Sequence, residues 1–327
     1  MPRPRSTPDV YLLSKVGSLY YAEHRTQQEI ADRLGISRPA VSRLLQEAHD
    51  RGIVQITVAA PGGLHLELER RLESRFGLAA AQVVDVDRDA GRRRDKLRRE
   101  IGAAAAAYLA RTVQPGETIG LAWGTTLDAM VQAMSPLTRS GASVVQTLGG
   151  IGPPDANAYA AEVVRRLAQL LGATPVLLPA PGVVATRAVR NALRRDHHVR
   201  TALARLDRLD AIYVGIGSLR SNPVLRDGRS LPAGIYRELR AAGAVGDIAL
   251  RFFDHAGAPV RSSLDDRILG ITAEQLRATK RVVAMAGGPD KVDAIYAALM
   301  AGLVDVLVTD SITAATIAGR APAPARR

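Results

Sequence analysis

Short apolar runs alternate with longer helical patterns through most of this 327-residue chain, and this alternation limits the possible folds more than any other feature. A helix that joins two strands allows them to pair in parallel and covers one face of their sheet. The sequence therefore predicts an α/β fold built on a mostly parallel sheet. The expected strands are residues 83–86, 118–123, 143–148, 175–178, 211–216, 282–286 and 304–309. The clearest helical patterns cover residues 98–111, 160–171 and 292–301.

A different pattern precedes residue 60. The helical patterns there are residues 10–21, 27–34 and 38–50, and a β-like run follows at residues 53–58. Ala59-Ala60-Pro61-Gly62-Gly63 then interrupts the periodicity, as proline and glycine do. A chain of this length can bury two cores. We therefore expect one domain at residues 1–60 and a second at residues 61–327.

The second domain is expected to begin with an amphipathic helix over residues 64–76. Leu64, Leu68, Leu72 and Phe76 recur every four residues and so lie on one face of that helix. Such a stripe either packs on its own domain or joins two chains as a dimer-forming connector. Both arrangements need the same periodicity, so both remain open.

Residues 26–45 carry the start and stop signals of two short helices. Thr26-Gln27-Gln28-Glu29 has the capping-box form, in which Thr and Glu each bind the other's amide at the start of a helix. Gly35 ends that helix, because glycine adopts the left-handed conformation without steric cost. Ser37 is placed to cap the next helix, and Pro39 falls in its first turn, where a missing N–H costs nothing. Two capped helices joined by a glycine turn are typical of a helix-turn-helix.

The second of these helices has two different faces. The apolar face, expected to turn toward the first helix, consists of Val41, Leu44, Leu45 and Ala48. The opposite face is rich in side chains that reach phosphates and base edges when a recognition helix enters a major groove. The residues predicted to contact DNA are Thr26, Gln27, Ser37, Arg38, Pro39, Ser42 and Arg43. Residues 53–58 would add a β wing. The alternative is an ordinary helical hairpin with a solvated basic face, or one that binds protein.

The charge of the chain is consistent with a polyanionic partner but does not locate the binding surface. The formal net charge is +12, while residues 1–60 hold 8 basic and 6 acidic residues, a net of +2. The remaining +10 therefore lies outside the predicted DNA-binding domain.

Composition also bears on several other classes of protein. The chain has no cysteine, which excludes a disulfide framework and thiolate zinc sites. No apolar run reaches the roughly 18 residues that cross a bilayer, so we expect no membrane partner and a cytoplasmic location. The six histidines are scattered, and the adjacent His197 and His198 are not expected to share one helix face. We expect neither a metal nor a cofactor.

The chain resembles the SorC family of sugar-responsive transcriptional regulators. The strongest likeness runs from Gln28-Glu29-Ile30-Ala31 through Gly35-Ile36-Ser37-Arg38-Pro39-Ala40-Val41-Ser42-Arg43-Leu44-Leu45. Further matches follow in order at residues 119–126, 177–181, 243–247, 286–288, Lys291 and residues 307–310. One such motif is weak evidence for the family, but an ordered set of motifs over nearly the whole chain is specific to it.

The resemblance implies an effector domain with the fold of ribose-5-phosphate isomerase and glucosamine-6-phosphate deaminase, assembled into dimers or tetramers. It implies double-stranded operator DNA, a phosphorylated sugar and further copies of the chain as partners, with the sugar bound above the sheet and altering operator affinity. Two positions depart from the family pattern. Ala40 stands where relatives often carry Thr, which puts one base contact in doubt. Leu148 stands where many carry a polar residue, which puts one ligand hydrogen bond in doubt.

Glycine turns after three of the expected strands form the candidate effector site. Gly124-Thr125-Thr126 opens a helical pattern, where free amides, hydroxyls and close backbone approach favour a phosphate, although such turns are also common in purely structural roles. The resemblance makes Lys291 the best cationic partner for that phosphate. Asp247 would accept hydrogen bonds from sugar hydroxyls or cap a turn. The predicted effector-binding residues are Gly124, Thr125, Thr126, Gly149, Gly150, Asp247, Gly287, Gly288 and Lys291.

These features favour a sequence-specific DNA-binding regulator that is controlled by a phosphorylated sugar or related metabolite. The main alternative is a sugar-phosphate isomerase or deaminase with an accessory N-terminal hairpin. Such an enzyme needs a carboxylate base and a partner acid, and Asp247, Asp254 and His255 match no catalytic spacing. An architectural DNA-binding protein without a ligand would have no use for the glycine turns. We therefore predict no catalytic residues.

Overall fold

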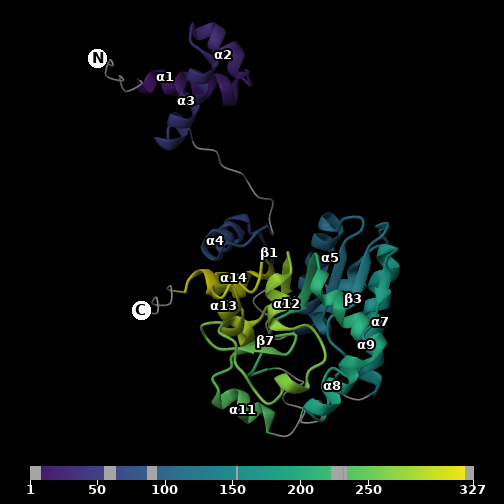
Figure 1. The fold of residues 1–327 in the computed structure, drawn as a ribbon. Helices are drawn as coiled ribbons and strands as arrows, with labels where there is room; N and C mark the ends of the chain where they lie inside the picture. The colour runs from purple at the N-terminus through teal and green to yellow at the C-terminus, as the bar shows by residue number, and fades with distance from the viewer. Residues whose placement is uncertain are drawn as a thin grey trace, which may run out of the picture. The chain divides into compact units, whose positions relative to one another are not determined.

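The computed structural model describes residues 9–54, 64–86, 94–151, 154–221, 231 and 234–320, without the side chains of residues 154–158. The chain divides into two compact units, residues 1–60 and 61–327 (Figure 1). The first unit is helical, and the second is built around a parallel sheet.

The first unit contains the predicted helix-turn-helix. Its elements are α1 (Val10–Gly17), the π-helix η1 (Ser18–Ala22), α2 (Gln27–Leu34) and α3 (Arg38–Asp50). Both bonds of the predicted capping box between Thr26 and Glu29 are present, and Gly35 ends α2 with a φ of 65°. The pattern at residues 10–21 is helical as predicted, but it changes from α to π geometry after Gly17.

The core of the first unit confirms the predicted orientation of α3. Its buried side chains are Leu13, Val16, Leu19, Ile30, Ala31, Val41, Leu44, Leu45 and Ala48. A Cβ on Gly17 would lie 2.8 Å from Cγ2 of Val54, so the chain after α3 returns against α1. Ile53 and Val54 form a bend rather than the start of the predicted wing strand. Residues 55–58 of that run lie outside the described residues.

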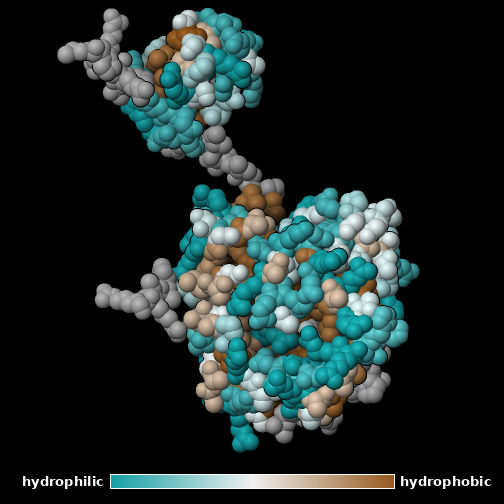
Figure 2. All heavy atoms as spheres, in the orientation of Figure 1, coloured by the Kyte–Doolittle hydropathy of each residue, from teal (hydrophilic) through white to brown (hydrophobic). Residues whose placement is uncertain are grey.

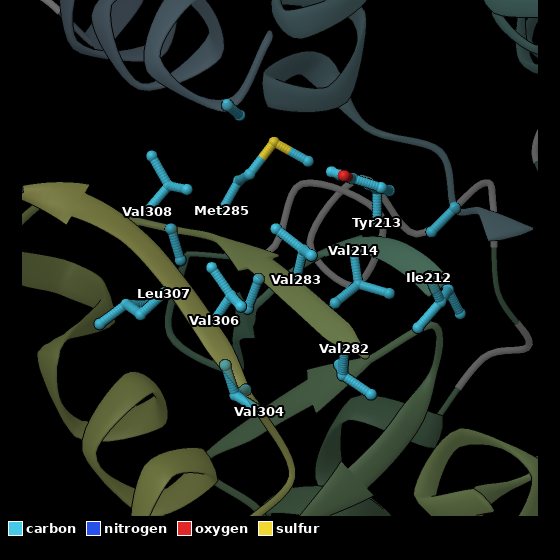
Figure 3. Close-up of a cluster of buried hydrophobic side chains, with 14 of the residues drawn as sticks. Ile212, Tyr213, Val214, Val282, Val283, Met285, Val304, Val306, Leu307 and Val308 are labelled. Carbon is cyan, nitrogen blue, oxygen red and sulfur yellow. The ribbon is translucent and has the colours of Figure 1, made fainter. Parts of the chain in front are cut away.

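A seven-stranded parallel sheet forms the centre of the second unit, in the order β1-β10-β9-β5-β2-β3-β4. The strands are β1 (Ala80–Val84), β2 (Thr118–Leu121), β3 (Ser143–Gln146), β4 (Thr174–Val176), β5 (Ala211–Gly215), β9 (Val282–Met285) and β10 (Val306–Asp310). All seven predicted runs are therefore confirmed. Aliphatic side chains cover both faces of the central strands, as runs of Val, Ile and Leu predict for a parallel sheet (Figure 3).

Helices and a small second sheet surround the parallel sheet. The helices are α4 (Leu66–Phe76), α5 (Arg94–Thr112), α6 (Thr125–Ala133), α7 (Pro154–Leu171), α8 (Arg187–Arg195), α9 (His197–Ala204), α11 (Ile235–Ala241), α12 (Ala273–Ala278), α13 (Val292–Met300) and α14 (Ser311–Ala318). Short 3-10 turns are η3 (Arg205–Arg208), η4 (Asp265–Arg267) and η5 (Pro289–Lys291). The antiparallel sheet consists of β6 (Gly217–Ser218), β7 (Gly246–Ile248) and β8 (Arg251–Phe253). Its middle strand β7 packs against α13.

Helix α4 packs on its own unit, as the first alternative for residues 64–76 expects, and its role as a connector between two chains stays a prediction. Leu72 is fully buried and Phe76 packs against the same core, with α4 lying beside β1 and α14 (Figure 1). Glu73 and Glu69 accept the amide hydrogens of Ala81 and Val83, each at 2.8 Å, so α4 covers the free edge of β1. Leu64 and Leu66 are 54% and 42% exposed, where Figure 2 shows an apolar patch beside α4.

Candidate nucleic-acid interface and ligand crevice

The outer face of α3 carries the side chains predicted to contact DNA. Arg38, Pro39, Ser42 and Arg43 are all exposed, opposite the buried face of the same helix. Within the described part of the chain, neither Arg38 nor Arg43 forms an ion pair. Ser37 occupies the N-cap position as predicted, but its hydroxyl makes no capping hydrogen bond. The N-terminal half of α3 therefore presents two guanidinium groups that are available to bind an anion.

The start of α2 is held together by its own side chains. The Thr26 hydroxyl donates to Oε2 of Glu29 at 3.0 Å and accepts the Glu29 amide hydrogen at 3.3 Å. The Thr26 amide also donates to Glu29, at 2.7 Å, and these bonds lower the pKa of the Glu29 carboxyl. The observed role of Thr26 is therefore capping, and its contact with DNA stays a prediction. Gln27 is half-buried beside it.

A hollow in the surface of the first unit adjoins both helix starts. Its lining consists of Tyr20, Tyr21, His24, Arg25, Thr26, Gln27, Gln28 and Arg38. The sequence prediction missed Tyr20, Tyr21, His24 and Arg25. A pair of tyrosines followed by two basic residues, directly before a capping box, was the available signal.

In the second unit, the carboxyl ends of the parallel strands bring the predicted effector residues to one edge of the sheet. Gly124 follows β2 and Gly287 follows β9, with β5 between these two strands. Asp247 pairs with Gly217, which follows β5. Two strand spacings amount to about 10 Å, so turns at the ends of β2 and β9 can face one small ligand.

The turn after β2 leaves backbone donors available. Gly124 is the N-cap of α6 with a φ of 146°, and no side chain caps that helix. Thr125 is exposed and Thr126 is half-buried at its first turn. An uncapped helix start presents N–H groups and the positive end of the helix dipole, an arrangement that favours an anion.

Lys291 lies at the end of η5, directly before α13, in surroundings that disfavour its charge. Burial is the main cause that lowers the pKa of its ammonium group, and the positive charges of Arg98 and Arg94 on α5 lower the pKa further. Among the residues that the structure describes, the charge of Asp247 opposes this shift. Among the described residues, no hydrogen bond or ion pair engages the Lys291 ammonium. Arg94 and Arg98 are paired with Asp290 and Asp95, at 2.6 and 2.9 Å, so Lys291 is the cation here that a bound anion would stabilise.

Asp247 takes the turn-capping role that the sequence left open. Its buried carboxylate accepts the amide hydrogen of Leu250 at 3.1 Å, in the hairpin turn between β7 and β8. Ala249 and Leu250 have φ values of 51° and 61°, which residues other than glycine rarely adopt. A contact of Asp247 with sugar hydroxyls stays a prediction.

The other two glycine pairs have packing roles that the sequence did not reveal. A Cβ on Gly149 would lie 2.4 Å from the carbonyl oxygen of Ala180, and the Gly149 amide donates to Leu269 at 3.1 Å. The Gly150 carbonyl accepts the amide hydrogen of Gly182 at 2.7 Å. The Gly288 amide donates to Asp310 and to Thr313. Close backbone approach accounts for Gly149, and a φ of 97° accounts for Gly288. The contact of these glycines with an effector stays a prediction.

The two departures from the family pattern occupy different environments. Leu148 is 1% exposed and lies in an apolar cluster against which the half-buried Trp123 packs. The surroundings of the turn after β3 are therefore apolar. Ala40 is half-buried near the start of α3.

His197 and His198 are the first two residues of α9. Their rings contact each other edge to face, with centroids 5.4 Å apart. No group of three or more metal-binding side chains occurs among the residues that the structure describes. None of the described helices is long and apolar enough to cross a membrane.

Comparison with known proteins matches each unit to a separate family model. The model described as "Putative sugar-binding domain" matches residues 63–318, and a model of the MarR family matches residues 16–63. The deoxyribonucleoside regulator of Bacillus subtilis (strain 168) is 34% identical over 302 residues, which cover 90% of this chain and 93% of that protein. The sorbitol operon regulator of Klebsiella pneumoniae is 30% identical over 315 residues, which cover 94% and 98%. The crystal structure of full-length SorC from Klebsiella pneumoniae matches with a TM-score of 0.72 at 28% identity, over 96% of this chain and 100% of that one.

A MarR-type helix-turn-helix joined to a sugar-binding α/β domain defines a DNA-binding transcriptional regulator. The chain belongs to the SorC family of sugar-binding transcriptional regulators. The regulator hypothesis therefore holds against the enzyme alternative, because these relatives regulate transcription. The further likeness to the folds of ribose-5-phosphate isomerase and glucosamine-6-phosphate deaminase stays a prediction.

Proposed function

We propose that the crevice at the carboxyl ends of β2, β5 and β9 binds a phosphorylated sugar or related metabolite, and that binding changes the affinity of α3 for its operator. The environment of Lys291 carries this proposal. Its pKa is lowered by burial and by Arg98 and Arg94, and an anion of two negative charges would reverse that penalty. An effector that carries negative charge would therefore bind better here than a neutral sugar.

The phosphate would lie between Lys291 and the start of α6. The first amides of α6 and the hydroxyls of Thr125 and Thr126 would donate to its oxygens from one side. Lys291 would donate a charge-assisted hydrogen bond from the other, worth about 1.5–3 kcal/mol. Asp247, which opposes the pKa shift of Lys291, would accept hydrogen bonds from sugar hydroxyls beside the phosphate.

Operator binding would use α3 in a major groove, with Arg38, Ser42 and Arg43 toward the DNA. A helix-turn-helix of this size gains specificity from two half-sites, so we propose that the protein acts as a dimer or tetramer in the cytoplasm. Effector and operator would be linked through a coupling free energy, so each would change the affinity of the other by the same factor.

The test of the effector half compares each sugar phosphate with its unphosphorylated counterpart, together with inorganic phosphate. Trp123 is the single tryptophan of the chain and directly precedes Gly124, so its fluorescence reports on the crevice. Lys291→Ala should weaken a phosphorylated effector far more than its unphosphorylated counterpart, in calorimetry and in Trp123 quenching. DNA affinity of the ligand-free variant should hardly change. Equal losses for the two sugars would remove Lys291 from the phosphate site.

The test of the operator half uses Arg43→Ala, with Gln46→Ala as a control on the same helix. Arg43 is uncommitted, whereas the Gln46 amide already donates to Asp50 at 2.9 Å. If Arg43 binds a guanine through two hydrogen bonds, Arg43→Ala should cost about 1–3 kcal/mol on the preferred duplex and nothing in effector affinity. Unchanged affinity for that duplex in a mobility-shift titration would refute the assignment.

A further inference from the structure

The turn that joins η1 to α2 has an unusual backbone. The Glu23 amide donates to the Ser18 carbonyl at 3.1 Å, which closes a π turn, and the Arg25 amide reaches back to Leu19 at 3.0 Å. His24 between them has a φ of 53°, in the left-handed region that few residues other than glycine adopt. Backbone of this kind persists where the surrounding structure holds it, and it occurs often at functional sites.

This turn brings together side chains that a regular helix would separate. Tyr20 and Tyr21 of η1 contact each other edge to face, with ring centroids 4.9 Å apart at 86°. They line the hollow described above together with His24 and Arg25 of the turn and Arg38 of α3. Four elements therefore contribute to one concave surface: η1, the turn, and the starts of α2 and α3.

The hollow is chemically suited to an anion with several oxygens. It holds two guanidinium groups, an imidazole, two phenols and two carboxamides, and no carboxylate is among its lining residues. Two carboxylates adjoin the hollow: Glu29 lies 3.9 Å from Arg25 and is engaged by the amide and hydroxyl of Thr26, and Glu23, next to His24, pairs with Arg33 at 3.5 Å. Gln28 donates to Asp32 at 2.8 Å, so the free donors are concentrated at Arg25, Gln27 and Arg38.

We propose that this hollow clamps one phosphate of the operator backbone, next to the groove that α3 enters. Arg25 and Arg38 supply the charge, and the Tyr21 hydroxyl and the His24 ring supply further hydrogen bonds. Arg38 is the first residue of α3, so a phosphate bound here sets the depth and register of the recognition helix without reading any base. The inference rests on the proposed function in one respect, namely that α3 is the helix that reads DNA.

The test is Arg25→Gln in the full chain, with Arg33→Gln as the matched control. The two side chains are similarly exposed, 51% and 54%, and each has one loose acidic neighbour, at 3.9 and 3.5 Å. Binding is titrated over a range of salt against two duplexes: one that the wild-type protein selects from a random pool, and one of mixed sequence that it does not select.

Arg25→Gln should weaken both duplexes by about the same factor, on the order of 10-fold, because phosphates carry no sequence information. It should also make the negative slope of log K against log salt less steep by about 0.9, the value for one lost phosphate contact. Arg33→Gln should leave the slope unchanged. Tyr21→Phe, which keeps the packing of the ring pair, should weaken both duplexes by a smaller equal factor.

Three outcomes would overturn the clamp. The first is an unchanged slope in Arg25→Gln, and the second is the same slope change in Arg33→Gln. The third is a loss confined to the selected duplex, which would indicate a base contact instead. Arg43→Ala separates this failure from failure of the proposed function. If Arg43→Ala weakens the selected duplex while Arg25→Gln changes nothing, only the clamp is wrong; if neither matters, α3 is not the reading helix.

Discussion

The carboxylate of Asp310 accepts the amide hydrogen of Gly288 at 2.8 Å, so the last residue of β10 fixes the turn that follows β9. The same carboxylate accepts the hydroxyl and the amide of Thr313, at 2.6 and 2.8 Å, and caps α14. Gly287 has to be glycine at this point, because a Cβ there would lie 2.3 Å from Asp310. One buried side chain thus holds two neighbouring strand ends and, three residues beyond Gly288, the position of Lys291.

Asp310→Ala should therefore destabilise the second unit. The Thr313 amide would lose its partner in a buried setting, at a cost of about 1–3 kcal/mol, while the Gly288 amide would keep only its bond to the Thr313 hydroxyl. Urea denaturation followed by circular dichroism measures this loss. Asp290→Ala is the control, because Asp290 lies on the same turn and forms an exposed ion pair with Arg94 at 2.6 Å, worth no more than about 1 kcal/mol. Equal losses in the two variants would contradict the anchoring role of Asp310.

Gly149→Ala should lower stability because there is no room for a methyl group beside the backbone of residues 180–182. Overpacking of this kind costs about 1–3 kcal/mol. Gly215→Ala is the matched control at the end of β5, where the nearest atoms to a Cβ would be 3.9 Å away. The melting temperature should fall in the first variant and stay close to wild type in the second. A Gly149→Ala protein of normal stability would show that this glycine is not required for packing.

Effector affinity should depend on pH through Lys291. The pKa of Lys291 lies below its ordinary 10.5 in the ligand-free protein, and a bound phosphate would raise it. In the range between these two pKa values, binding takes up protons, so affinity falls as pH rises. Calorimetry in alkaline buffers of different ionisation enthalpy measures that uptake. It should vanish in Lys291→Met and persist in Lys280→Met, whose exposed ammonium pairs with Asp210 at 2.7 Å.

The same group affects the stability of the ligand-free fold. Because the pKa of Lys291 is lowered in the folded state, the unfolded chain binds more protons between that lowered value and 10.5. Stability should therefore rise with pH across this window, and Lys291→Met should remove this contribution. A stability profile in which Lys291→Met parallels the wild type throughout would contradict the lowered pKa.

A fragment that begins at residue 64 should fold without the first unit. Its core is continuous from Leu72 to Ala318, and α4 covers the edge of β1 through Glu69 and Glu73. The fragment should show cooperative unfolding and keep effector binding, but it should not bind DNA because it lacks α3. An unfolded or insoluble product would show that the first unit supports the second.

Sequence alone predicted every strand of the main sheet and the limits of α2, because these depend on local properties. Apolar runs mark strands buried on both faces, and Thr26, Glu29 and Gly35 act on amides within a single turn of helix. The observed strand boundaries differ from the predicted ones where residues of another element bind the strand. The strand β1 begins at Ala80 rather than at residue 83, and two of its amides are bound by α4.

The roles of the individual site residues were decided only by the tertiary structure. The partner of the Gly288 amide is 22 residues away in Asp310, and the backbone that excludes a side chain from Gly149 belongs to another turn. His24 and Arg38 line one hollow because the intervening turns fold them together. A glycine turn has the same sequence whether it faces a ligand or a neighbouring backbone. The choice depends on which strand ends the topology places side by side, and no local pattern contains that information.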